Sequence, residues 1–319
     1  MLPQANCALP EGFRLEPYRI ERKLSHGGFS IVYLARDRNG TEVAIKEYLP
    51  GSLALRAEGE LRPRVPADKQ AVFRYGLKCF FEEGRALAVL SHPNVVRVLN
   101  FLRANDTVYL VMAFEHGRTL HEYARQRHGR LDERFLRLSF VRLLNGLREV
   151  HARKLLHLDI KPSNIMLRPD GTPVLLDFGA ARQTLSATQP LLKPMYTPGF
   201  AAPEQFADLG ALGPWTDIYG VGACLYACIV GKPPPRADHR LEKDDYQPLA
   251  VGDAHARYSL QLRALVDWCL RLDPLARPQS VHALQKALRY EGGEGGEAAD
   301  ASLAGRLAAL MNPTPGRDA

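Results

Sequence analysis

Short runs of β-branched and aromatic residues fill the first third of the chain and stop before Gly117. Such runs, bounded by turn residues, are typical of strands. The turn DRNG at residues 37–40 joins two of them, as in a β-hairpin. Residues 68–90 carry apolar side chains at helical spacing, which predicts one helix among the strands. The predicted strands are YRIERKL, SIVYLAR, TEVAIKEY, VVRVLNFL and TVYLVMA.

After Gly117 the pattern becomes helical. Asp132 is placed to cap one helix and Thr216 to cap a second. The second, DIYGVGACLYACIV, is apolar nearly all round, which is typical of a buried helix. Two further helices are predicted near residues 259–271 and 280–290. A β-rich half followed by a helical half predicts an α+β, bilobal fold with a cleft between two lobes.

Both ends of the chain differ in composition from the middle. Residues 1–17 are rich in proline and polar residues and predict a flexible leader. Residues 291–319 open with EGGEGGEAAD and predict a disordered tail. The folded domain is therefore expected over residues 18–290, with a β-rich lobe at 18–112 and a helical lobe at 117–290.

Composition excludes several classes of protein. Hydrophobic residues make up 46% of the 319 residues, enough for a sizeable core. The net charge of +7 is modest, and no interleaving of basic and aromatic residues indicates a nucleic-acid groove. The five cysteines are odd in number and form no CxxC pair, which indicates neither a zinc site nor a disulfide framework. Without a signal peptide or an apolar run of ~20 residues, the sequence predicts a cytoplasmic protein with no membrane span.

A pair of glycines lies between the first two predicted strands, in KLSHGGFSIVYLA. Gly27 and Gly28 let backbone N–H groups approach phosphate oxygens without a side chain in the way. Ser25 and Ser30 stand where a fuller G-x-G-x-x-G pattern has its first and third glycines. This motif alone is equally compatible with a plain hairpin turn.

Lys46 ends the motif VAIK on the third predicted strand. Strand alternation puts Ala44 and Lys46 on one face, and the small Ala44 leaves room for a flat ring beside the lysine. Glu83 on the following helix is a candidate ion-pair partner that holds Lys46 toward the α- and β-phosphates of a nucleotide. Its neighbour Glu82 is the rival candidate, and a solvated lysine is the alternative for Lys46 taken alone.

The stretch HLDIKPSN holds the candidates for catalysis. Phosphoryl transfer needs an oriented nucleophile, neutralised charge and bound metal ions. Asp159 is suited to accept a hydrogen bond from a substrate hydroxyl, and Lys161 to neutralise charge on the γ-phosphoryl. Asn164 offers an oxygen ligand to Mg²⁺. Asp177 follows an apolar strand in the motif DFG, 13 residues after Asn164, and is suited to bind the same kind of ion.

These motifs, in this order, resemble those of the eukaryotic-like Ser/Thr protein kinases found in bacteria. The resemblance covers about Tyr18 to Tyr290 and rests on VAIK, HPNVV, HLDIKPSN, DFG, AAPEQ, TDIYGVG and DPLARP. Glu83 lies ten residues before Pro93, as the helix glutamate does in that family, which selects it over Glu82. The resemblance implies that ATP binds with Mg²⁺, or with Mn²⁺, and that its γ-phosphoryl passes to a protein Ser or Thr hydroxyl.

The resemblance implies further site residues. Glu204 and Arg277 would form an ion pair that braces the larger lobe, and Asp217 would tie the catalytic loop to the buried helix. Thr197 matches a threonine that supports the catalytic loop, and Lys161 matches the lysine usual in Ser/Thr kinases. The resemblance also implies the residues that contact the adenine ring: a roof of Leu24, Val32 and Ala44, a floor at Met166, Met112 at the back, and the backbone of Ala113 and Glu115. For the apolar residues among them, ordinary core packing is the alternative.

One departure from the family concerns regulation. Leu158 stands where many members have an arginine that binds a phosphate on the activation segment. Activity is therefore expected not to depend on such a phosphate. Phosphorylation of Thr184, Ser186 or Thr188 is expected to change the rate little.

A second departure is an insert. Thirty-seven residues lead from Lys46 to Glu83, about twice the family spacing, and the extra stretch lies within residues 47–76. A similar insert follows VAIKEYLP in some bacterial kinases. Three roles remain open for it: docking a partner, restraining the helix of Glu83, or forming a tolerated surface loop.

Two other functions are consistent with parts of the sequence. A pseudokinase scaffold would suit Ser25 and Ser30 if they weaken ATP binding. A small-molecule phosphotransferase is disfavoured by AAPEQ and the Thr197 segment, which build a platform for a peptide chain. Protein substrates and, by resemblance, a dedicated Ser/Thr phosphatase are the expected partners. The polar residues that favour an active kinase are all present: Lys46, Glu83, Asp159, Asn164 and Asp177.

Overall fold

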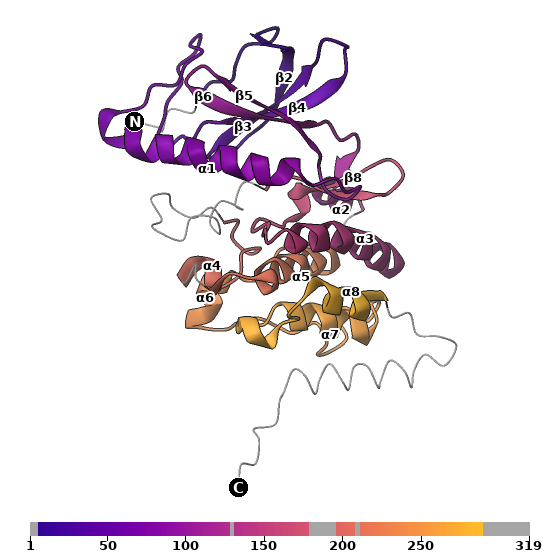
Figure 1. Cartoon of the computed structure of the whole chain (residues 1–319). Helices are drawn as coiled ribbons and strands as arrows, with labels where there is room; N and C mark the ends of the chain where they lie inside the picture. Colours follow the sequence, from indigo (N-terminus) through magenta and orange to yellow (C-terminus); the bar gives the residue numbers. More distant parts are fainter. Residues whose placement is uncertain (1–5, 128–130, 179–195, 208–210, 290–319) are drawn as a thin grey trace. The chain divides into compact units, whose positions relative to one another are not determined.

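The structure, a computed structural model, describes residues 6–127, 131–178, 196–207 and 211–289. The described chain divides into two units, one that runs to Glu115 and one that starts at His116 (Figure 1). The first unit holds a six-stranded sheet and the long helix α1, and the second is mainly helical. The predicted α+β class, with the β-rich part first, is confirmed.

The first unit is built on an antiparallel sheet in which all five predicted strands are present. The hairpin predicted at residues 37–40 is also present. Its Gly40 has φ +81°, a conformation that favours glycine, and the Asp37 N–H donates to the Thr41 carbonyl at 3.0 Å. In the order β1-β2-β3-β4-β6-β5, the strands are β1 (Arg14–Leu15), β2 (Tyr18–His26), β3 (Ser30–Arg36), β4 (Glu42–Tyr48), β6 (Thr107–Ala113) and β5 (Val98–Ala104).

The helix predicted at residues 68–90 is present as the short turn η1 (Ala67–Lys69) followed by α1 (Gln70–Ala88). α1 packs against one face of the sheet, where the Tyr48 ring lies 5.3 Å from Phe73 and 5.7 Å from Phe80. Burial of these aromatic rings removes apolar surface from water and supplies much of the driving force that holds the helix on the sheet.

Charged residues are buried on the opposite face of the sheet. Arg56 and Glu47 are both 0% exposed and form a two-bond ion pair, with Nη1 to Oε1 at 2.6 Å and Nη2 to Oε2 at 2.7 Å. The Tyr33 and Tyr109 hydroxyls donate to the same carboxylate at 2.7 and 2.9 Å. Because Arg56 belongs to the insert, the insert is part of the core of this unit and not a tolerated surface loop.

Residues 6–17, predicted to belong to a flexible leader, are instead packed. Asn6 Nδ2 donates to the Ala54 carbonyl at 3.1 Å, and its Oδ1 accepts from the Arg56 N–H at 2.6 Å. β1 pairs with β2, and Leu9 is buried. The sequence predicts a loose segment here because local patterns do not reveal these contacts, which join residues about fifty positions apart. Residues 1–5 and the tail predicted at 291–319 lie outside the described residues.

The second unit is organised around the buried helix α5 (Pro214–Val230). α5 packs against α7 (Leu260–Cys269), and α3 (Glu133–Ala152) packs against α8 (Val281–Arg289). The four helices predicted for this half are therefore present. The remaining elements are β7 (Arg118–Thr119), α2 (Leu120–Gln126), η2 (Pro162–Asn164), β8 (Ile165–Leu167), β9 (Pro173–Leu175), α4 (Glu204–Ala207), α6 (Ala237–Glu242) and η5 (Pro274–Ala276).

The start of α5 differs from the prediction. Its first helical residue is Pro214, and Thr216 lies inside the first turn, where its Oγ1 accepts from the Gly213 N–H at 3.1 Å. Proline is favoured at the first helical position because an N–H there has no partner in the helix. Asp132 occupies the N-cap position of α3, as predicted, but its side chain makes no capping hydrogen bond there. No helix in the described ranges is long and apolar enough to cross a membrane.

Candidate active site

The first unit places four predicted nucleotide-binding residues on one face of its sheet. Val32 is paired with Lys46, and Ala44 is paired with Met112, across neighbouring strands. Directly paired residues point to the same face, and residues two apart on one strand do so as well. The other predicted adenine contacts of this unit are Leu24 on β2, Ala113 at the end of β6, and Glu115 shortly after it.

Gly27 and Gly28 form the exposed turn between β2 and β3. A Cβ added at Gly28 would meet no atom within 4 Å, so packing inside the unit does not require a glycine there. A small residue with open space around it suits the close approach of a ligand. Two backbone hydrogen bonds attach the insert to this turn. The Gly51 N–H donates to the Gly28 carbonyl at 3.0 Å, and the Leu49 N–H donates to the Phe29 carbonyl at 2.8 Å.

Lys46 and Glu83 are both buried in the first unit. Lys46 Nζ lies 5.7 Å from the centre of the Phe80 ring. Phe80 and Glu83 are three residues apart on α1 and share one face of the helix, so Lys46 points toward the face that carries Glu83. The rival Glu82 has a side chain that is 44% exposed and pairs with Arg85 at 3.4 Å. Of the two glutamates, Glu83 is the one on the side of α1 that meets β4.

In the second unit, three side chains hold the carboxylate of Asp159. Thr197 Oγ1 donates to Oδ1 at 2.8 Å, and Asn164 Nδ2 donates to Oδ2 at 2.9 Å. Lys161 Nζ lies 2.8 Å from Oδ2 and donates to Thr197 Oγ1 at 2.8 Å. The predicted residues Asp159, Lys161 and Asn164 are therefore brought together, and the supporting threonine joins them. This network fixes the direction of a carboxylate that still reaches solvent.

The hairpin of β8 and β9 brings the two predicted metal ligands toward each other. Ile165 pairs with Leu175, and the Leu176 N–H donates to the Asn164 carbonyl at 2.8 Å. Asp177 is the next residue after Leu176, so it lies near Asn164. Amide and carboxylate oxygens are the donors that Mg²⁺ takes, and it commonly uses only one or two carboxylates together with phosphate oxygens. This donor set fits Mg²⁺. The predicted adenine floor, Met166, lies on β8 beside these residues.

His157 connects the catalytic loop to the DFG motif. Its ring lies 4.4 Å from the Phe178 ring, and its Nε2 is 2.9 Å from the Leu176 carbonyl. Its Nδ1 accepts from the Asp159 N–H at 3.3 Å. A neutral ring with its proton on Nε2 satisfies both contacts. The loop that carries Asp159 and the segment that carries Asp177 are thus joined by one buried side chain.

Asp217 on α5 anchors the same loop through the backbone, as the resemblance implies. Its Oδ2 accepts from the His157 N–H at 2.9 Å, and its Oδ1 from the Leu158 N–H at 2.7 Å. His151 Nε2 also lies 2.7 Å from Oδ2. Burial by itself raises the pKa of Asp217, but the contact with His151 and the other hydrogen bonds outweigh burial and hold the pKa below its ordinary value. Asp217 is therefore a charged anchor inside the unit.

The implied ion pair of the larger unit is confirmed. Arg277 donates to Glu204 through two bonds, Nη1 to Oε1 at 2.7 Å and Nη2 to Oε2 at 2.9 Å. Thr216 Oγ1 adds a third donor to Glu204 at 2.8 Å. The Arg277 guanidinium also lies 5.0 Å from the centre of the Tyr219 ring. This buried pair fixes AAPEQ to the rest of the unit.

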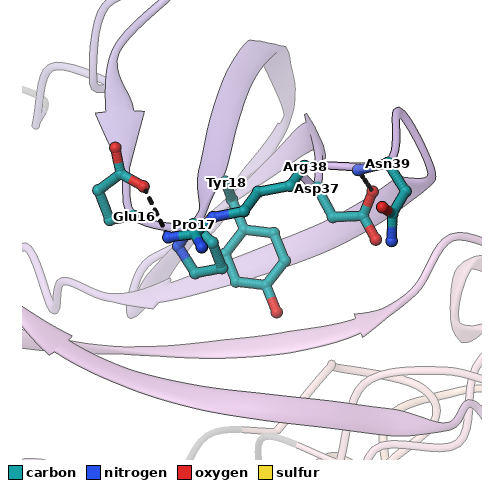
Figure 2. Close-up of a pocket in the computed structure, with 6 residues that line it drawn as sticks. All are labelled: Glu16, Pro17, Tyr18, Asp37, Arg38 and Asn39. Carbon is teal, nitrogen blue, oxygen red and sulfur yellow. Dashed lines mark hydrogen bonds and ion pairs between the residues drawn. The ribbon is translucent and has the colours of Figure 1, made fainter.

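Two surface pockets lie away from the predicted residues. Figure 2 shows one of about 390 Å³, where Arg38 and Glu16 form an ion pair at 3.5 Å. The other, of about 690 Å³, lies in the second unit and includes Arg240 and Tyr246. Neither is lined by a residue predicted for nucleotide or metal binding. The lining of the first consists of Glu16, Pro17, Tyr18, Asp37, Arg38 and Asn39.

The model of the protein kinase domain matches residues 18–288 of this chain. The chain belongs to the protein kinase family. Serine/threonine-protein kinase PkaA of Streptomyces coelicolor is 31% identical over 317 residues, which cover 93% of this chain and 54% of PkaA. Sperm motility kinase 2B of Mus musculus is 30% identical over 270 residues, or 84% of this chain and 50% of that kinase. The chain spans about half the length of these curated relatives.

Solved kinase structures share the fold. The apo form of PpkA-294 is 37% identical, with a TM-score of 0.76, and the match covers 88% of this chain and 99% of that one. The kinase domain of PknI from Mycobacterium tuberculosis matches with a TM-score of 0.66 at 20% identity, over 88% of this chain and 98% of that one. The predicted kinase fold and the resemblance to bacterial Ser/Thr kinases are confirmed.

One residue beside the catalytic loop was not singled out from the sequence. Gln205, the last residue of the motif AAPEQ, is buried and donates through Nε2 to the Leu158 carbonyl at 2.9 Å. The signal in the sequence was a polar amide placed directly after Glu204, at the end of a motif that the resemblance singles out. The predicted phosphorylation sites Thr184, Ser186 and Thr188 lie outside the described residues.

Proposed function

We propose that this protein is a Ser/Thr protein kinase, which transfers the γ-phosphoryl of ATP to Ser or Thr hydroxyls of other proteins. The observation that carries the proposal is the set of contacts around Asp159. Thr197 and Asn164 donate to its two carboxylate oxygens, and Lys161 lies within 2.8 Å of one of them. A carboxylate held in this way is suited to orient a hydroxyl nucleophile for attack on a phosphoryl group.

Each residue of this group has a separate task. Asp159 accepts the hydrogen bond of the substrate hydroxyl and takes its proton as the new bond forms. Lys161 neutralises charge on the transferring γ-phosphoryl. Asn164 and Asp177 would hold Mg²⁺, which when bound neutralises charge on the phosphate oxygens. Mn²⁺ is the alternative ion because it takes the same oxygen donors.

The residues of the first unit are proposed to bind the rest of the same ATP molecule. Lys46, oriented by Glu83, would contact the α- and β-phosphates, and the backbone of Gly27 and Gly28 would lie along them. The face of the sheet that carries Val32 and Ala44 supports an apolar contact with the adenine ring. The remaining proposed adenine contacts are Leu24, Met112, Ala113, Glu115 and Met166.

Activity is proposed to be independent of a phosphate on the activation segment. Leu158 is buried and apolar, so it does not supply the cation that such a phosphate needs. The proposed substrates are proteins. A dedicated Ser/Thr phosphatase that reverses the reaction is proposed from the resemblance alone. A cytoplasmic location is proposed from the cysteines, whose odd number and spacing indicate no disulfide framework.

The test is transfer of the γ-phosphoryl of ATP to a generic basic protein in the presence of Mg²⁺. The wild type should label the substrate, and removal of the metal with a chelator should abolish labelling. Asp159→Asn should lower the rate at least a hundredfold, because the positioned base is removed while the fold is kept. Thermal unfolding of the variant within a few degrees of the wild type would exclude a folding defect. Equal background labelling by both proteins would instead favour the pseudokinase scaffold.

A further inference from the structure

Leu158 has a strained backbone in the centre of the catalytic loop. Its φ is +62°, in the left-handed region that residues with a side chain seldom adopt. Side chains from two other elements hold its peptide groups. Its N–H donates to Asp217 Oδ1 at 2.7 Å, and its carbonyl accepts from Gln205 Nε2 at 2.9 Å. A strained residue is kept in place when its surroundings restrain both sides of it.

Gln205 is one half of this restraint. It lies in α4, is 3% exposed, and uses both ends of its amide. Its Oε1 accepts from the Ala202 N–H at 2.9 Å, and its Nε2 donates to the Leu158 carbonyl. Only a neutral amide offers an acceptor and a donor in this geometry. Glutamine therefore joins the motif AAPEQ to the catalytic loop, across 47 residues of sequence.

The carbonyl of Leu158 belongs to the peptide that leads into Asp159. Rotation of that peptide plane would move the Asp159 backbone and turn its carboxylate away from Thr197 and Lys161. The Leu158 side chain adds an apolar contact, since it packs with Leu156 and Leu212. The loop and the segment after residue 200 are thus linked by one amide and one apolar contact, neither of which needs a charge.

We infer that Gln205 is a positioning residue for Asp159, which it holds through the Leu158 carbonyl by an uncharged amide link. The inference rests on the proposed function. It assigns to the last residue of AAPEQ a role in catalysis through the catalytic loop, beyond the structural role of Glu204.

The decisive variant is Gln205→Met, which keeps the length of the side chain and removes both hydrogen bonds. The matched control is Gln285→Met. Gln285 is also buried, at 2% exposure, and its Nε2 donates to the Val141 carbonyl at 2.9 Å, between α8 and α3. Both variants lose a buried amide, so both should lower the melting temperature by a similar amount.

Only the first variant should slow catalysis. We expect kcat of Gln205→Met to fall about tenfold, the effect of losing the buried hydrogen bond to the Leu158 carbonyl that holds the loop of the base. The KM for ATP should stay within about twofold because Gln205 is not among the proposed ATP contacts. The control Gln285→Met should keep kcat within about twofold of the wild type. A kcat for Gln205→Met equal to that of the control would overturn the inference.

A second measurement does not depend on activity. Amide hydrogen exchange of the peptide that covers residues 155–165 should speed up in Gln205→Met and stay unchanged in Gln285→Met. Unchanged exchange in both variants would overturn the inference. If exchange changes as expected but the wild type transfers no phosphoryl group, the proposed function fails while the link between Gln205 and the loop stands.

Discussion

The buried pair of Arg56 and Glu47 should dominate the stability of the first unit. Arg56→Met removes the guanidinium but keeps a long apolar side chain. The guanidinium donates to both Glu47 oxygens, to the Tyr33 hydroxyl at 2.9 Å and to the Cys7 carbonyl at 2.8 Å. After its removal, Glu47 would remain fully buried with only hydroxyl donors. Breaking a buried pair in this way costs about 3–5 kcal/mol of unfolding free energy.

The expected change is large enough to measure directly. For a chain of this size each kcal/mol shifts the melting temperature by about 2–4 °C, so Arg56→Met should lower it by about 10 °C. Burial by itself lowers the pKa of Arg56, but its bonds to Glu47 outweigh burial and raise that pKa, so the guanidinium stays charged at any pH used. Because the same insert holds the Gly28 turn, we also expect a higher KM for ATP in the variant.

Two comparisons separate the buried charge from other effects. Arg36 also contacts two carboxylates, Glu21 at 2.6 Å and Glu42 at 2.7 Å, but its side chain is 42% exposed. Arg36→Met should therefore lower the melting temperature much less than Arg56→Met does, because water screens an exposed ion pair. In the double variant Arg56→Met, Glu47→Gln, the orphaned charge is gone and most of the stability should return. Thermal and urea unfolding, followed by circular dichroism, would measure all four proteins.

The reasoning fails under either of two results. If Arg56→Met shifts the melting temperature no more than Arg36→Met does, burial of this pair has no special cost. If the double variant is no more stable than Arg56→Met, the loss does not come from the uncompensated charge of Glu47.

Three further predictions concern regulation, pH and thiols. Changing Thr184, Ser186 and Thr188 together to Ala should leave most of the kcat, because Leu158 is apolar; a collapse of kcat in a phosphorylation assay would refute this. The pKa of Asp217 is lowered by folding, so its contribution to stability is present above its ordinary value of 3.8 and is lost as the pH falls below it. Urea unfolding between about pH 2 and 5 should show this loss. Asp217→Asn should be less stable near neutral pH and should lack this part of the acid dependence. Burial raises the pKa of three thiols, that of Cys228 to about 12, so iodoacetamide should label them only after unfolding, as read by mass spectrometry. The protected thiols are Cys224, Cys228 and Cys269, and the two partly exposed ones are Cys7 and Cys79.

Local patterns predicted most of the secondary structure. β3 occupies the predicted run at Ser30–Arg36, and the hairpin at residues 37–40 closes as its turn residues indicate. These predictions succeed because strand alternation, helix periodicity and turn chemistry depend on residues a few positions apart. The start of α5 was missed by three residues, since the cap is Gly213 and not Thr216. Both Pro214 and Thr216 are favourable near a helix N-terminus, and the pattern does not rank them.

The candidate site was predicted unevenly. Asp159, Lys161 and Asn164 lie within six residues of one another, so a short motif was enough to group them. Glu83 was separated from Glu82 only by a family spacing, and burial of Glu83 now agrees with that choice. Gln205 was missed because its partner is a backbone carbonyl, which leaves no mark on the sequence.

The sequence by itself determined the order of strands and helices, the kinase family and the residues suited to phosphoryl transfer, because these depend on local spacing and side-chain chemistry. The tertiary structure alone decided that Arg56 lies in the core and that Gln205 holds the catalytic loop. From the sequence alone, an arginine or a glutamine is expected to lie on the surface, because most of these residues do. Burial of such a side chain is stable only if a partner replaces its hydrogen bonds to water. The fold supplies that partner: Glu47 for Arg56, and the Leu158 carbonyl for Gln205.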